Sequence, residues 1–130
     1  MKQKFVINCE YDPRVQEIAE KLLEHVILKK EVITYSDLVS RLSYNTSPAG
    51  AEKMLTLISR ICFDNELLPI SAMVVKKNTK MPGEGFFKEF FPRQKDDNII
   101  YSMYFELVND IKNYKGWNKV LTAFINWDKE

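Results

Sequence analysis

The chain has only one histidine and two cysteines, Cys9 and Cys62, among its 130 residues. These three residues are too few for a zinc site of the usual cysteine and histidine spacing. Two isolated cysteines also do not form a disulfide framework. We expect both thiols to be reduced and buried, because each stands among apolar neighbours. We expect no metal and no other cofactor. We also expect no enzymatic activity, since no pair of nucleophile and base can be recognised.

Long apolar runs are also absent, and no stretch approaches the roughly 18 residues needed to cross a membrane. The segment Pro82-Gly83-Glu84-Gly85 lacks the lysine and the hydroxyl residue that end a phosphate-binding loop. Its composition is typical of a turn in which glycine adopts positive φ. Because no apolar run is long enough to cross a membrane, the sequence predicts no membrane contact. With reduced thiols, a cytoplasmic location is expected.

What the sequence does contain is enough apolar material for a folded core. Hydrophobic residues make up 45% of the chain, a composition that disordered proteins do not have. The length fits one domain, residues 1–130. The formal net charge is only +1, whereas dedicated nucleic-acid binders are usually more basic. Any contact with DNA must therefore depend on a local basic patch.

Capping residues and apolar spacing predict the order of the elements. Helices are expected to begin at Asp12-Pro13, Thr34 and Ser47-Pro48, where a side-chain cap precedes an apolar stripe. Two more helices are expected near the C-terminus, from Asn98 and from Trp117. Strands are expected over residues 4–9 and 67–75, whereas the aromatic run 86–91 fits either a strand or a helix.

This order predicts an α+β fold that resembles a winged helix. The helix after Thr34 and the longer helix after Ser47 would form a helix-turn-helix. A β-hairpin that includes residues 67–75 would form the wing. An N-terminal strand and helix and two C-terminal helices would complete the domain.

One segment carries a more specific resemblance. The run Val32-Ile33-Thr34-Tyr35-Ser36-Asp37-Leu38-Val39, the helix after it, and Leu68-Pro69 with Val74-Val75 resemble the DNA-binding domain of the alkylguanine-DNA alkyltransferase and alkyltransferase-like family. The resemblance covers residues 32–85. The family's Pro-Cys-His-Arg segment corresponds to Pro69-Ile70-Ser71-Ala72, and its arginine finger falls within Ala49-Gly50-Ala51-Glu52. Without the alkyl acceptor and the finger, the resemblance implies DNA binding without alkyl transfer.

The local charge pattern is consistent with a DNA contact. Residues 76–95 contain six basic and two acidic side chains, a net +4, and a solvated charged loop is the competing interpretation. In a winged helix, lysines of the wing would contact phosphates and the second helix of the pair would approach the major groove. The candidate DNA-binding residues are Asn45, Ser47, Lys53, Thr56, Arg60, Lys76, Lys77 and Lys80.

A protein-interaction module is the alternative function. The near-neutral charge and the aromatic C-terminal third favour it, because interface hot spots are rich in tyrosine and tryptophan. Leu-Pro-x-x-Ala-x-Val-Val, ending in Pro-Gly-x-Gly-Phe, resembles segments of small bacterial proteins and favours a bacterial or phage origin. The partner would be a host complex or a second copy bound through the last two helices. The candidate anchors are Tyr101, Tyr104, Trp117 and Trp127.

Overall fold

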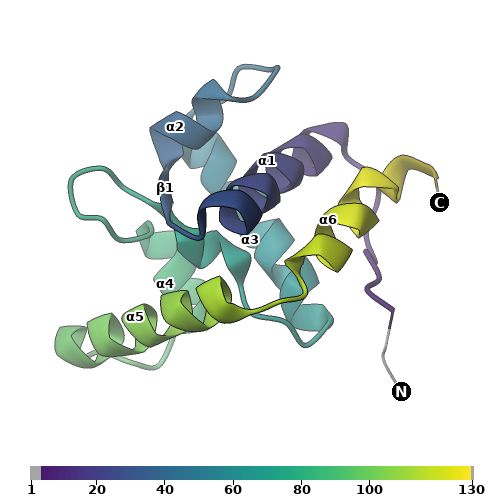
Figure 1. Ribbon diagram of the computed structural model, residues 1–130. Helices are drawn as coiled ribbons and strands as arrows, with labels where there is room; N and C mark the ends of the chain where they lie inside the picture. The colour runs from purple at the N-terminus through teal and green to yellow at the C-terminus, as the bar shows by residue number, and fades with distance from the viewer. Residues whose placement is uncertain (1–3, 130) are drawn as a thin grey trace.

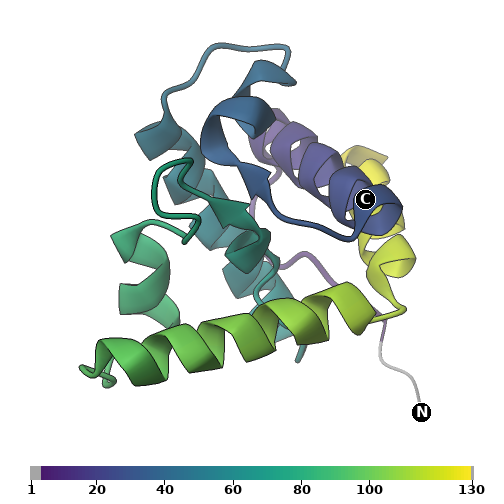
Figure 2. The ribbon, with the colours of Figure 1, turned by 60° about the vertical axis from the view of Figure 1, so that its left-hand side comes forward.

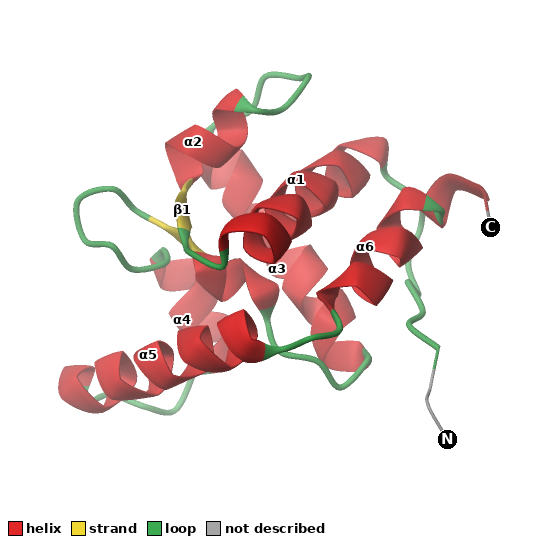
Figure 3. Cartoon of the chain, viewed as in Figure 1, coloured by secondary structure: helices red, strands yellow, loops and turns green. Residues whose placement is uncertain are grey.

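The structure, a computed structural model, describes residues 4–129 (Figure 1). Helices dominate this part of the chain, and the two strands are only two residues long (Figure 3). The elements, in order, are α1 (Pro13–Lys29), β1 (Ile33–Thr34), α2 (Tyr35–Ser40), α3 (Pro48–Asp64), the 3-10 helix η1 (Ile70–Met73), β2 (Val74–Val75), α4 (Glu84–Phe90), α5 (Asp97–Asn113), α6 (Trp117–Ile125) and the 3-10 helix η2 (Trp127–Lys129).

The three predicted helix starts are confirmed. The Asp12 carboxylate accepts a hydrogen bond from the backbone N–H of Arg14, and Pro13 occupies the first position of α1. The Thr34 hydroxyl accepts from the N–H of Asp37, and the Ser47 hydroxyl accepts from the N–H of Gly50. Each cap satisfies a donor that the helix itself leaves without a partner, which stabilises the helix by about 1 kcal/mol.

The predicted winged-helix fold is wrong, because the described residues contain no β-hairpin wing. The two strands pair in parallel, with Ile33 beside Val74 and Thr34 beside Val75. Most of the strand predicted over residues 67–75 is the 3-10 helix η1 and the turn before it.

Side chains from two helices explain why η1 is not a strand. The Ser59 hydroxyl of α3 accepts a hydrogen bond from the N–H of Ser71 at 2.9 Å. The Tyr104 hydroxyl of α5 donates to the carbonyl of Ala72 at 2.7 Å. These bonds replace the neighbouring strand that an extended segment would need at this depth, since buried backbone groups must find partners.

The predicted N-terminal strand is also wrong. Residues 4–10 are extended but lie in no sheet. Both the N–H and the carbonyl of Val6 pair with the side-chain amide of Asn65, each at 2.8 Å. Cys9 in this segment is exposed, contrary to the expectation, whereas Cys62 is buried in α3.

The turn predicted over residues 82–85, with glycine at positive φ, is wrong. No glycine among the described residues has a positive φ. Gly83 is instead the residue that precedes α4, and Gly85 lies inside its first turn. The aromatic run 86–91 is mostly helical, with Phe86 buried and Phe87, Phe90 and Phe91 half-buried against it.

The core lies around α1, which packs against α2, α3 and α6. Helix α5 lies apart from α1, along the lower edge of the molecule, and packs on η1 (Figures 1 and 2). Tyr104, Val108 and Ile111 are its buried residues. The apolar spacing after Asn98 predicts that Ile99 and Met103 face inward too, but both are exposed, because they lie on a different side of α5 from Tyr104, Val108 and Ile111.

Candidate functional site

Residues 76–82, here called the lysine loop, connect β2 to the start of α4. The loop is closed by its own backbone, with hydrogen bonds from the N–H of Lys76 to the carbonyl of Met81 and from the N–H of Lys80 to the carbonyl of Lys76, both 2.9 Å. Lys80 adopts a left-handed conformation, with a φ of 60°. Lys76, Lys77 and Lys80 are all exposed. The loop therefore presents three cations on a defined backbone.

The far end of the lysine loop is anchored by α2 and α3. The backbone N–H of Gly83 donates to the Tyr35 hydroxyl at 3.1 Å, and the N–H of Gly85 donates to the Glu52 carboxylate at 3.0 Å. A Cβ atom on Gly83 or on Gly85 would lie within 3.0 Å of a Glu52 oxygen. At either position a larger residue would force the Glu52 carboxylate to move. Glu52, in turn, is committed to the start of α4.

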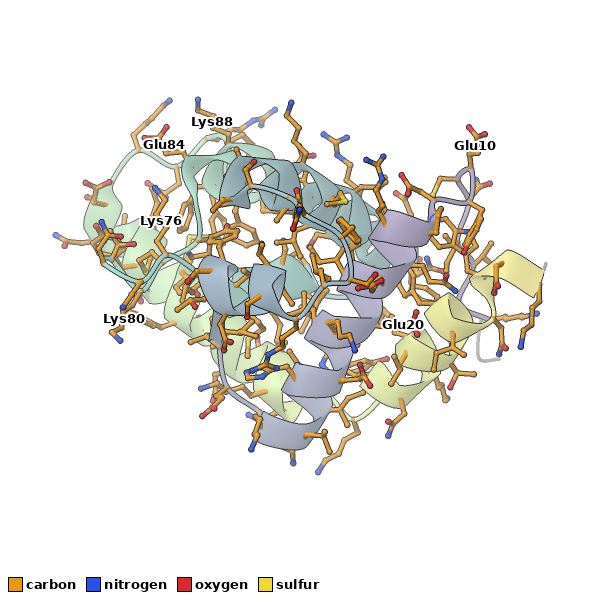
Figure 4. The ribbon with its side chains drawn as sticks, turned by 90° about the horizontal axis from the view of Figure 1, so that it is seen from above. Glu10, Glu20, Lys76, Lys80, Glu84 and Lys88 are labelled. Atoms are coloured by element: carbon orange, nitrogen blue, oxygen red, sulfur yellow. The ribbon has the colours of Figure 1, made fainter. Side chains whose placement is uncertain are left out.

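The loop lysines differ in their charge environment from three of the four arginines. Arg14, Arg41 and Arg60 each form an ion pair, with Asp12, Asp37 and Glu89 respectively. The three loop lysines have no carboxylate within ion-pair distance in the described chain. In Figure 4, Lys76 and Lys80 lie at the same end of the molecule as Lys88 and Glu84, and away from Glu10 and Glu20.

Some of the candidate DNA-binding residues of α3 and of the turn before it already have hydrogen-bond partners within the protein, and others do not. Arg60 donates to Glu89 of α4 at 2.8 Å and 3.2 Å, and this hydrogen bonding lowers the pKa of Glu89. The Thr56 hydroxyl donates to the carbonyl of Glu52, and Ser47 is the α3 cap. Asn45 and Lys53 are exposed, and their side chains form no hydrogen bond or ion pair with the described residues. Of this set, those two remain available beside the loop lysines.

The predicted protein-interaction anchors lie mostly in the core. Tyr104, Trp117 and Trp127 are buried, and the Trp117 ring donates to the carbonyl of Ile111 at 2.9 Å. Tyr101 is exposed. Three further apolar residues of α5 are exposed but were not predicted from the sequence as anchors, namely Ile99, Met103 and Phe105. The width of the apolar face of α5 was the available signal, since one neighbour cannot cover so wide a face.

A cavity of about 750 Å³ lies between the N-terminal segment and α6, with Phe5, Asn65, Leu67, Val120 and Asn126 among its lining residues. Two lysines, Lys4 and Lys119, also line it, and its described lining contains no acidic, histidine or cysteine side chain. The described residues contain no group of three or more side chains placed to hold a metal ion, and no helix long and apolar enough to cross a membrane.

No protein-family model, curated protein or solved structure matches this chain. Function must therefore be inferred from the side chains themselves, and the lysine loop is the best-defined group of them.

Proposed function

We propose that this protein is a non-catalytic DNA-binding protein that holds the phosphate backbone with its lysine loop. The observation that carries the proposal is the state of Lys76, Lys77 and Lys80. All three are exposed, all lie on one hydrogen-bonded loop, and none has a carboxylate partner in the described chain. An unpaired ammonium group gains most from a phosphate, because it gives up no existing ion pair and releases counterions from the DNA.

The anchoring of the loop favours binding for a second reason. Hydrogen bonds within the loop, and from Gly83 to Tyr35, fix the backbone that carries the lysines. A fixed backbone loses less conformational entropy on binding than a mobile one. Lys53, the residue after Glu52 in α3, is a fourth exposed cation. Glu52 should repel a bound phosphate only weakly. Its carboxylate is turned to the N-terminus of α4, where it accepts a hydrogen bond from the N–H of Gly85.

The corrected fold changes the kind of contact that we expect. A loop of three lysines contacts the backbone of one DNA segment and carries little sequence information. With a net charge of +1, the rest of the chain supplies no strong attractive field. Binding should therefore be sequence-tolerant and strongly dependent on salt.

Fluorescence anisotropy with a labelled duplex at about 50 and 200 mM salt tests the proposal. Three phosphate contacts should lower the affinity by about tenfold or more between these conditions. The triple variant Lys76→Ala, Lys77→Ala, Lys80→Ala should bind at least tenfold more weakly, with a logarithmic salt slope reduced by about 2–3.

A matched control removes the same charge elsewhere. Lys29, Lys115 and Lys129 are also exposed but lie outside the loop. Their triple alanine variant should keep most of the affinity of the unmodified protein. Equal losses in both triple variants would mean that net charge alone drives binding, and the lysine loop would lose its assignment. No binding at micromolar protein would refute the DNA proposal itself.

Protein interaction is the second candidate function, and one observation favours it. Ile99, Tyr101, Met103 and Phe105 of α5 are 40–62% exposed, although they are large and apolar. Exposed apolar groups of this kind mark interaction surfaces. Failure of the protein to bind duplex DNA, together with self-association or a partner that protects α5, would favour this candidate.

A further inference from the structure

The exposed apolar side chains of α5 fall on two separate strips along the helix. At 100° per residue, Tyr101 and Phe105 lie on one flank of the buried face, and Ile99 and Met103 lie on the other. Polar residues separate the two strips on the solvent side. One neighbouring helix can therefore cover one strip but not both.

The strip that contains Ile99 continues with two acidic residues. Ile99, Met103, Glu106 and Asp110 follow one another at spacings of four, three and four, so they form a single line along α5. All four are exposed. The line is apolar in the first half of the helix and acidic in the second. Two basic residues, Arg93 and Lys95, stand just before the helix, exposed and without an ion pair in the described chain.

We propose that this line binds a second copy of the chain, with the two α5 helices antiparallel about a twofold axis. With the axis near residue 101, Ile99 of each copy packs on Met103 of the other. Glu106 and Asp110 then lie towards the N-terminal end of α5 in the second copy, which Arg93 and Lys95 precede in the chain. The contact is isologous, so each of these interactions occurs twice.

Charge complementarity selects this occupant and this orientation. The acidic half of one α5 lies towards the two basic side chains, Arg93 and Lys95, that precede the other α5. A parallel pair would place acidic residues against acidic residues. Of the two acidic residues at this end, Asp97 lies on the opposite side of α5 from the line, and the Asp96 carboxylate is turned to its own helix, where it accepts hydrogen bonds from the N–H groups of Asn98 and Ile99. The strip with Tyr101 and Phe105 contains no comparable acidic half.

The size of the contact sets its strength. These side chains cover on the order of 400 Å² of each copy, about half of a standard interface. The dimer should therefore be weak and should form only at high protein concentration. The inference does not depend on the proposed DNA contact, because the lysine loop takes no part in it.

Sedimentation velocity of the full chain tests the proposal, over about 10 µM to about 1 mM protein at low salt. We expect the sedimentation coefficient to rise with concentration, and the rise to weaken at high salt. Met103→Glu should weaken dimerisation at least tenfold. Phe105→Ser is the matched control on the opposite flank, and it should leave dimerisation unchanged. Circular dichroism confirms that both variants fold, as expected for exposed positions.

A charge swap tests the orientation. Lys95→Glu and Glu106→Lys should each weaken the dimer, because each places like charges together. The double variant exchanges the charges and should recover most of the lost affinity. A monomer at every concentration would overturn the proposal. Dimerisation that is sensitive to Phe105→Ser but not to Met103→Glu would overturn it too, as would a double variant that shows no recovery.

Discussion

The Glu52 carboxylate of α3 accepts a hydrogen bond from the backbone N–H of Gly85, at 3.0 Å. This contact caps α4 from outside the helix, since Gly83 offers no side chain for the purpose. It also fixes where the lysine loop ends, because the loop leads directly into α4. One ionised side chain thus joins the second long helix to the proposed DNA-contacting loop.

Gly85→Ala should destabilise the protein by about 1–3 kcal/mol, measured by urea unfolding. The added Cβ would lie 2.4 Å from Oε1 of Glu52. We expect the free-energy cost of relieving this clash to exceed the stability that alanine gains over glycine in a helix. In a double-mutant cycle, Gly85→Ala should cost less when Glu52 is already alanine. Strictly additive losses would show that the clash with Glu52 is not the cause.

Tyr104→Phe should lower the free energy of unfolding by about 1–3 kcal/mol. The variant removes the hydroxyl that donates to the buried carbonyl of Ala72. Tyr101→Phe on the same helix is the control, and it should have almost no effect because Tyr101 is exposed. Similar melting temperatures for the two variants would contradict this account of η1.

Asn65→Ala should release the N-terminal segment without unfolding the core. The amide group of Asn65 provides both the acceptor and the donor for Val6, and it also donates to the carbonyl of Ile61. We expect faster hydrogen exchange at the Val6 amide and faster proteolysis within residues 4–10. Unchanged exchange at Val6 in the variant would show that other contacts hold the segment.

The two thiols should react very differently in the native protein. Cys9 is exposed, whereas burial raises the pKa of Cys62 to about 12. A thiol reagent at about pH 8 should therefore modify one cysteine in native buffer and both in urea, as counted by mass spectrometry. Rapid modification of Cys62 in native buffer would indicate local opening of α3.

Stability should depend on pH through Glu17. Hydrogen bonds from the hydroxyl and the N–H of Ser43 lower the pKa of this carboxyl below 4.5. The unfolded chain therefore binds the proton at a higher pH than the folded chain, so stability falls as the pH drops below about 4.5. Glu17→Gln should flatten this part of the curve in urea unfolding at several pH values. An equally steep curve in the variant would assign the dependence to other carboxyls.

The helix starts could be predicted from the sequence because their causes are local. Asp12, Thr34 and Ser47 each bond to an N–H two or three residues away, so the pattern of neighbours is sufficient. The stripe of α3, from Ala51 to Cys62, is buried as its spacing predicts. The three lysines of the candidate site were also found from the sequence, since charge and a polar turn are visible there.

The tertiary structure alone decided the rest, because the causes lie far apart in the chain. The segment before β2 forms a 3-10 helix because Ser59 and Tyr104 supply its hydrogen bonds from two different helices. Gly83 and Gly85, at the start of α4, lie close to Glu52, which is more than thirty residues earlier in the chain. The periodicity of α5 predicts one wide apolar face, but only the packing decides that Tyr104 is buried and Met103 is not. The sequence by itself thus determined where helices begin and where charge gathers, and long-range contacts determined which surfaces remained open.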